Sequence, residues 1–115
     1  MNLSELVQYV LNNNCLYARQ WVQDSIHMKF DWSTVKEPSE LEGKYLIVAA
    51  AITNLFAKRN NVSPPKWIKK VMASNKPIWL IRQDMPRLSK RVEKECPESL
   101  RSYNVYAPSN YLTLV

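Results

Sequence analysis

The sequence predicts an all-α fold: a compact bundle of five to six helices around a buried central helix, in a single helical domain of residues 1–115. A chain of 115 residues fits one domain, and 46% of it is apolar, as a packed core requires. One glycine in the whole chain argues against sandwiches and barrels, which need many tight turns with positive φ. The seven prolines mostly stand where a helix would begin.

The first helix is predicted to begin after Asn2. The side chain of Asn2 can cap the helix, and Glu5 completes a capping-box arrangement. Apolar residues then recur at helical spacing up to Leu11 and leave one polar face. The asparagines at 12–14 should end this helix, because short amide side chains compete for backbone hydrogen bonds and tolerate a left-handed backbone.

A second helix should follow, and residues 29–38 are predicted to be a loop that lays aromatic side chains against the body. The helical spacing gives this second helix two apolar sides. One side carries Cys15, Ala18, Val22 and Ile26, and another carries Tyr17 and Trp21.

The clearest helix is predicted to begin with a capping box of Ser39 and Glu42 and to end near Asn60 and Asn61. Its apolar positions exceed a single stripe, and a helix that is apolar on nearly every face is buried. The stripe consists of Leu41, Tyr45, Val48, Ile52 and Leu55, and it is widened by Leu46, Ala49, Ala50 and Phe56.

A short helix is predicted after Ser63, because the two prolines that follow fix φ in the first turn, where a missing N–H costs nothing. Residues 75–81 are apolar and contain a proline, which predicts a buried turn or a short extended piece. The apolar stripe of the short helix, which should face the core, is predicted to consist of Trp67, Ile68, Val71 and Met72.

Two further helices are predicted near the C-terminus. Asp84 and Pro86 should open the first, which carries Leu88 and Val92, and the last should run from Pro97-Glu98 to about Tyr103. The segment from Asn104 to Val115 is rich in Val, Tyr, Leu and Thr, a composition typical of extended backbone.

Positive charge is concentrated in one part of the chain. Residues 1–57 carry four Lys and Arg against six acids, whereas residues 58–101 carry twelve against four, a net charge of +8. Such a distribution fits a surface for an anionic partner, although a solvated face that keeps the protein soluble would look the same. The predicted contact residues centre on Lys66, Lys69 and Lys70, flanked by Arg59, Lys76 and Arg82.

Two tryptophans stand beside these basic residues. Aromatic rings interleaved with lysines can stack the bases of a single-stranded nucleic acid, and Trp67 and Trp79 neighbour Lys66, Lys70 and Lys76. Both tryptophans also fall within apolar stretches, where bulky aromatics dominate core energetics. We therefore favour a core role for both.

No catalytic, cofactor-binding or metal-binding residues are predicted. His27 is the only histidine, and the sequence contains neither a Cys-x-x-Cys nor a His-x-x-x-His pair to complete a zinc site. Cys15 and Cys96 belong to no paired motif, so we expect reduced, buried thiols. Although a cysteine and a histidine can form a nucleophile and its base, nothing in the sequence brings Cys15 to His27. With one glycine, no glycine-rich phosphate loop can form.

Membrane insertion and secretion are not expected. The longest apolar run, Tyr45 to Ile52, is eight residues, whereas a transmembrane helix needs about 20. The N-terminus has neither the basic segment nor the apolar segment of a signal peptide. These features predict a cytoplasmic protein. No small-molecule ligand is expected.

Four short motifs follow one another over about the last two-thirds of the chain. They are residues 49–57, Val62 to Trp67, Pro77-Ile78-Trp79 and Pro97 to Tyr106. In this order they resemble a pattern in small bacterial proteins of toxin–antitoxin and mobile-element loci. That pattern has an alanine-rich helix, a P-x-W turn, a P-W turn and a C-terminal P-x-x-(F/L)-R-x-x-N-(V/I)-(F/Y) stretch.

The resemblance implies an antitoxin-like or accessory protein that acts through protein contacts, with no catalytic residue to carry over. Some members carry this segment after a helix-turn-helix, and others stand beside nucleotidyltransferase-like toxins, which implies such a toxin as one partner. This chain is too short for a separate DNA-reading domain, and three asparagines replace the usual glycine turn between its first two helices. The alternative from the residues themselves is a nucleic-acid-binding module that uses the basic surface of residues 58–101.

Overall fold

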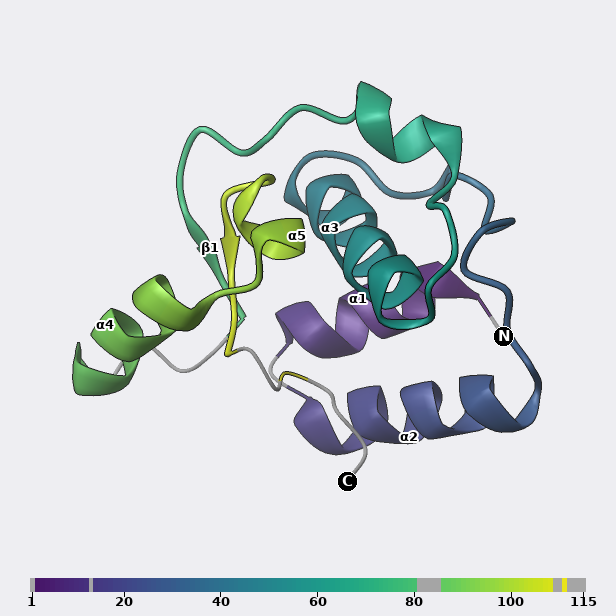
Figure 1. The fold of residues 1–115 in the computed structure, drawn as a ribbon, viewed down its shortest axis with the longest axis horizontal. Coiled ribbons are helices and arrows are strands. Elements are labelled where there is room, and N and C mark those ends of the chain that lie inside the picture. Colours follow the sequence, from purple (N-terminus) through teal and green to yellow (C-terminus); the bar gives the residue numbers. More distant parts are fainter. Residues whose placement is uncertain (1, 13, 81–85, 109–110, 112–115) are drawn as a thin grey trace.

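The computed structural model describes residues 1–115 except 1, 13, 81–85, 109–110 and 112–115, and for residues 15 and 86–89 it describes the backbone alone (Figure 1). Helix predominates in this part of the chain, which confirms the mainly helical class. The elements are α1 (Leu3–Leu11), α2 (Cys15–His27), α3 (Lys44–Arg59), the 3₁₀-helix η1 (Lys66–Lys70), β1 (Ile78–Trp79), α4 (Pro86–Glu95), α5 (Glu98–Arg101) and β2 (Val105–Tyr106).

Helix α3 packs against α1, α5 and η1, and α1 packs in turn against α2 (Figure 1). The Cα radius of gyration is 13.2 Å, close to the roughly 13 Å expected for a compact chain of this size. The finer prediction, a regular bundle ringed around one helix, stays a prediction. A long loop (residues 28–43) also packs on α3 through Trp32, and a two-stranded sheet packs against α5 through β2; neither of these elements is helical.

The middle of α3 is buried along its whole length. Residues 48–57 are all buried except Asn54, which is half-buried and donates from Nδ2 to the Ser99 carbonyl at 3.2 Å. Thr53 is fully buried, but its hydroxyl donates to the Ala49 carbonyl one turn earlier, at 2.7 Å. Because its polar side chains find partners, this helix can lie in the core without an unsatisfied polar group.

The predicted start of this helix is wrong. Ser39 lies in a turn, and α3 begins five residues later, at Lys44. Its N-cap is Gly43, with φ 60° and ψ −135°, and among the described residues no side chain caps the helix. An L-residue rarely adopts this backbone conformation, so the one glycine of the chain stands where the chain turns into α3. That turn prevented the helix from extending back to Ser39.

The predicted helix ends are confirmed. Helix α3 stops at Asn60, and Asn61 has φ 56°, so that the Val62 N–H bonds back to the Ala57 carbonyl at 3.0 Å. Helix α2 ends in the same way, with Lys29 at φ 52°. Both are Schellman-type ends, which satisfy carbonyls that a helix C-terminus leaves open. The first helix starts as predicted, since Asn2 Oδ1 accepts from the Glu5 N–H at 3.0 Å.

Aromatic rings from α2 and the following loop cover α3, as the loop prediction required. Trp32 stacks on Phe56 with ring centroids 4.8 Å apart, and Trp21 and Phe30 pack edge-on beside them. The predicted faces of α2 need correction, because Trp21 is buried whereas Ile26 is 62% exposed. Ser25 takes the buried place instead, and its hydroxyl bonds to the Val22 carbonyl, so a polar residue can lie on that face.

A small parallel sheet joins two segments far apart in sequence. Ile78 pairs with Val105 and Trp79 with Tyr106. The predicted extended pieces at 75–81 and after Asn104 therefore pair with each other, which periodicity within each piece could not show. Much of the remaining C-terminal prediction lies outside the described residues. In the described part of the chain, no helix is long and apolar enough to span a bilayer.

Replacing Val48, which is fully buried on α3, by Asp should abolish folding. The substitution places an unpaired charge in the core, where its desolvation costs more than a small domain's stability. A matched control is Leu16→Asp on α2, where the side chain is 77% exposed. Circular dichroism and thermal melting should show an unfolded Val48→Asp protein and a control that melts cooperatively; a cooperative Val48→Asp melt would contradict the assignment.

Substituting Gly43 by Ala should lower the free energy of unfolding by about 1–3 kcal/mol. A Cβ at this position would meet nothing within 4 Å, so the loss would come from the positive φ alone. Chemical denaturation measures it. An unchanged unfolding free energy would mean that the turn into α3 does not need this backbone conformation.

Candidate partner-binding surface

The positive charge lies in a stretch without any acidic residue. Between Glu42 and Asp84 the chain carries eight Lys and Arg and no Asp or Glu. Dividing the chain at residue 58 concealed this acid-free stretch, because the stretch begins fifteen residues earlier, at Gly43. Part of this stretch, residues 66–76, runs across the top of the molecule from η1 towards β1 (Figure 1). We refer to residues 66–76 as the basic ridge.

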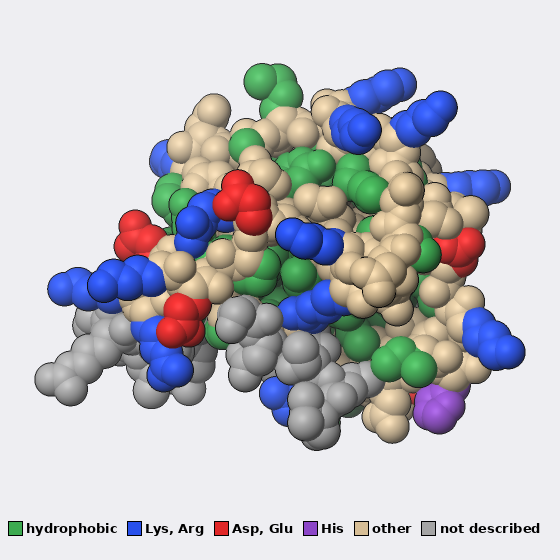
Figure 2. Space-filling model, in the orientation of Figure 1, with side chains coloured by type: hydrophobic (Ala, Val, Ile, Leu, Met, Phe, Trp, Pro, Cys, Tyr) green, Lys and Arg blue, Asp and Glu red, His purple; other side chains and the backbone are tan. Residues whose placement is uncertain are grey.

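Three lysines of the ridge stand on η1, and all are exposed. Pro65, in an extended conformation, precedes the helix, and the Ile68 N–H closes the first turn onto the Pro65 carbonyl at 3.4 Å. With three residues per turn, a 3₁₀-helix places Lys66 and Lys69 one above the other, with Lys70 beside them. Figure 2 shows Lys and Arg side chains gathered over this end of the molecule. In the described part of the chain, no ion pair holds these three lysines.

The start of the ridge is fastened to the body from below. Ile68 is buried, and its carbonyl accepts the Tyr103 hydroxyl at 2.6 Å. The indole N–H of Trp67 donates to the Val35 carbonyl at 2.8 Å. Burial also raises the pKa of Tyr103, which keeps the phenol in the protonated form that this bond requires.

The far end of the ridge is fastened as well. The Ser74 N–H donates to the Tyr103 carbonyl at 3.2 Å, and the Ser74 carbonyl accepts from Asn104 Nδ2 at 3.0 Å. The Ser74 hydroxyl closes the turn by donating to the Lys76 carbonyl at 2.6 Å. Bonds at both ends hold the ridge backbone in one conformation, which lowers the ordering cost of binding.

Met72 is the most exposed large apolar side chain among the described residues, at 83%. The sequence placed it on the buried stripe of a helix, and that prediction is wrong. Val71 has φ −82° and ψ 123°, so η1 has already ended and helical spacing no longer applies to Met72. As a result, an apolar side chain stands beside the lysines on the ridge.

The three flanking residues have different surroundings. Lys76 is exposed at the end of the ridge. Arg59 is half-buried: its guanidinium donates to the Tyr111 carbonyl at 2.7 Å and lies over the Phe56 ring, 5.3 Å from its centroid. Burial lowers the pKa of Arg59, although a guanidinium remains charged. Arg82 lies outside the described residues.

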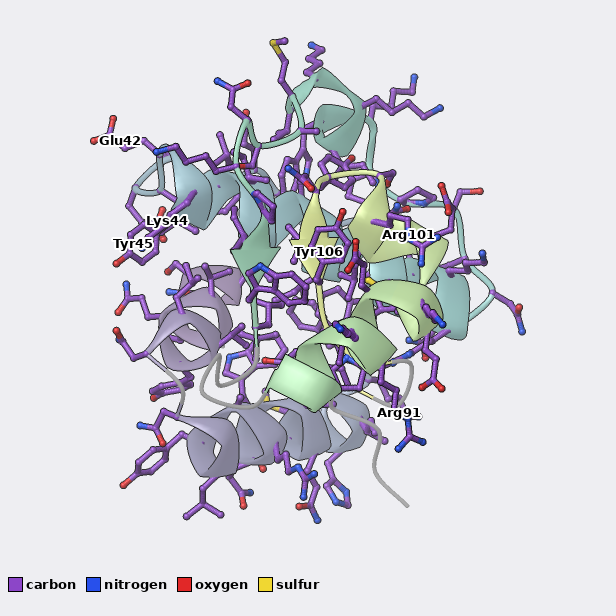
Figure 3. The ribbon with its side chains drawn as sticks, turned by 90° about the vertical axis from the view of Figure 1, so that its left-hand side faces the viewer. Glu42, Lys44, Tyr45, Arg91, Arg101 and Tyr106 are labelled. Carbon is purple, nitrogen blue, oxygen red and sulfur yellow. The ribbon has the colours of Figure 1, made fainter. Side chains whose placement is uncertain are left out.

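The two candidate stacking rings are both packed within the protein. Trp67 is half-buried against the core and uses its N–H to hold Val35. Trp79 is half-buried and stacks on Tyr106 with centroids 4.9 Å apart; Figure 3 shows Tyr106 on β2. This packing favours the structural role that we assigned to both tryptophans.

The remaining chemical groups in the described part of the chain do not come together in a site. Cys96 is a buried free thiol whose Sγ–H points to the Val105 carbonyl at 3.4 Å, and His27 is exposed. Among the described residues, no group of three or more His, Cys, Asp or Glu could hold a metal ion. On α4, Arg91 and Glu95 form an exposed ion pair at 3.4 Å, a pairing worth little to stability.

Comparison of the chain with protein-family models, with curated proteins and with solved structures returned no match. The resemblance to toxin–antitoxin and mobile-element proteins therefore stays a hypothesis, carried by its four short motifs.

Cys96 should react slowly with thiol reagents in the folded protein. Burial raises its pKa, so the reactive thiolate is scarce near neutral pH. We expect Ellman's reagent to react slowly with a native Cys15→Ser variant and completely after denaturation. Rapid reaction of the native variant would contradict a buried, inert thiol.

The raised pKa of Cys96 also makes the free energy of unfolding depend on pH. Because the folded pKa is raised, the unfolded chain loses its proton first, so the stabilisation is complete below the ordinary thiol pKa of about 8.5 and declines above it. Unfolding free energies of Cys15→Ser, with and without Cys96→Ala, should converge as the pH rises past that value. Tyr103 titrates in both proteins, so its contribution cancels.

Proposed function

We propose that this protein is a non-enzymatic binding protein that contacts an acidic partner protein through the basic ridge. One observation carries the proposal: three exposed lysines and an 83% exposed methionine stand on a backbone segment that is fastened at both ends. Lysines speed and orient the encounter with an acidic surface, while buried apolar contact supplies most of the affinity. The ridge offers both.

The four-motif resemblance suggests where such a partner would be found. An antitoxin-like or accessory role in a toxin–antitoxin or mobile-element locus would make the partner a protein of the same locus, for example a nucleotidyltransferase-like toxin. Neutralising a toxin by contact needs a surface and no catalytic group of its own. The predicted cytoplasmic location belongs to the same hypothesis.

Nucleic-acid binding is the second candidate, and the exposed lysines of η1 favour it. Phosphates would bind such lysines without reading sequence. Against this candidate, both tryptophans that could stack bases are packed against other residues. The exposed apolar side chain of Met72, on the same ridge, also suits a protein surface better than a phosphate backbone.

Changing Lys66, Lys69 and Lys70 together to Gln should weaken binding of the native partner while the melting temperature stays nearly unchanged, because all three side chains are exposed. The matched control is Lys90, Arg91 and Lys94 to Gln on α4, which removes the same charge from another exposed surface. Quantitative affinity purification from the host, with nuclease treatment, compares the wild type with both variants.

The expected result is a nuclease-resistant partner protein that the ridge variant loses and the α4 variant retains. Nucleic-acid binding would show instead in fluorescence anisotropy with a single-stranded oligonucleotide, with a log–log salt slope of about 0.7 per contacted phosphate that the ridge variant flattens. If neither binding responds to the ridge variant, the lysines form a solvated face and the proposal is wrong.

A further inference from the structure

Resting on the proposed function, we infer that a groove beside the ridge receives an apolar side chain from an acidic segment of the partner protein. The groove lies between the first turn of α3 and the second half of the ridge. It is lined by Gly43, Lys44, Ile47, Met72, Ala73, Ser74, Asn75 and Lys76.

The apolar lining of this groove is not covered within the described structure. Ile47 on α3 is half-buried, Ala73 is exposed, and Met72 is 83% exposed. Covering such side chains is favourable in proportion to the apolar area removed from water, and a flexible methionine adapts to the shape of what covers it. The groove can therefore hold one aliphatic or aromatic side chain between α3 and the ridge.

The charge around the groove selects the kind of segment that carries this side chain. Lys44 and Lys76 line it, and none of the described residues that line it is acidic. Glu40 and Glu42, the carboxylates nearest in sequence to Lys44, line a separate hollow together with Tyr45. Figure 3 shows Glu42, Lys44 and Tyr45 at this end of the helix.

Lys44 stands between the two hollows. It lines the groove, and its Nζ lies 5.8 Å from the centroid of the Tyr45 ring, which lines the other hollow. The separation of charge means that carboxylates flanking the anchor would meet lysines in the groove, whereas basic flanking residues would be repelled. The complementary ligand is thus an apolar residue among Asp and Glu.

The groove suits a peptide better than a nucleic acid. Its apolar residues are Ile, Met and Ala, which provide no flat ring for a base to stack on. Its backbone is also preformed, because Tyr103 and Asn104 hold Ser74 in place from below. A preformed backbone lowers the ordering cost of binding, and one buried apolar anchor can supply much of the affinity of a partner segment.

The test uses the full chain, labelled with ¹⁵N and with ¹³C-methyl methionine, and a synthetic peptide with one central leucine flanked by glutamates. Titration should shift the amide signals of Gly43, Ile47 and Ala73 and the methyl signal of Met72. The Met28 methyl, 68% exposed outside the groove, should not move. Two control peptides, one with serine for leucine and one with glutamine for glutamate, should each bind more weakly.

Replacing Met72 by Ser should weaken peptide binding about tenfold, the loss expected for one buried apolar anchor contact. Met28→Ser is the matched control, because it removes the same side chain from another exposed position and should leave binding unchanged. Lys76→Gln should weaken binding of the glutamate peptide and leave binding of the glutamine peptide unchanged.

Three outcomes would overturn the groove. In the first, the peptide shifts only the signals of Lys66–Lys70, and the Met72→Ser variant binds it as tightly as the wild type does. The ridge would then be the binding surface, and the groove would not take part. Absence of shifts at Gly43, Ile47 and Met72, while the ridge variant still loses the native partner, would do the same. A single-stranded oligonucleotide that shifts the groove signals more strongly than the peptide would assign the site to nucleic acid and overturn both proposals.

Discussion

Residues 48–57 of α3 leave no broad face to water, so neighbouring elements on every side have to cover this helix. Helices α1 and α5 and η1 supply part of the cover. The loop supplies the rest with Trp32, whose ring lies flat on Phe56. Because the apolar side chains of all these segments need α3 to pack against, its burial is the constraint on which the other elements depend.

Segments without regular structure can cover a helix only if their backbone polar groups find partners. Here side chains from distant parts of the chain supply them. Trp67 bonds to Val35, Tyr103 to Ile68 and Arg59 to the Tyr111 carbonyl. These bonds join segments more than thirty residues apart in sequence, so they order the irregular segments as ladders order a sheet.

The same bonds connect the core to the surface. Tyr103 and Trp67 hold the underside of the basic ridge, so the lysines above are presented on an ordered backbone. At the first turn of α3, lysines line one hollow and carboxylates another. A protein with a single glycine and many irregular segments thereby presents a fixed pattern of charge and apolar surface, which a specific partner would require.

The sequence by itself determined the elements that depend on local chemistry. The Asn2 cap, the ends of α1 and α3, the burial of residues 48–57 and the mainly helical class follow from capping, turn and periodicity rules acting over a few residues. The exposure of Lys66, Lys69 and Lys70 was also predicted from sequence, because charged residues at short spacing indicate an exposed face locally.

Only the tertiary structure decided which side chains meet. The start of α3 depends on a backbone conformation at Gly43 that the nearby Ser39 and Glu42 pattern concealed. The exposure of Met72 and Ile26 depends on where neighbouring elements lie, and the pairing of β1 with β2 joins segments 27 residues apart. Such contacts are set by packing between distant segments, and periodicity within one segment holds no information about its partner.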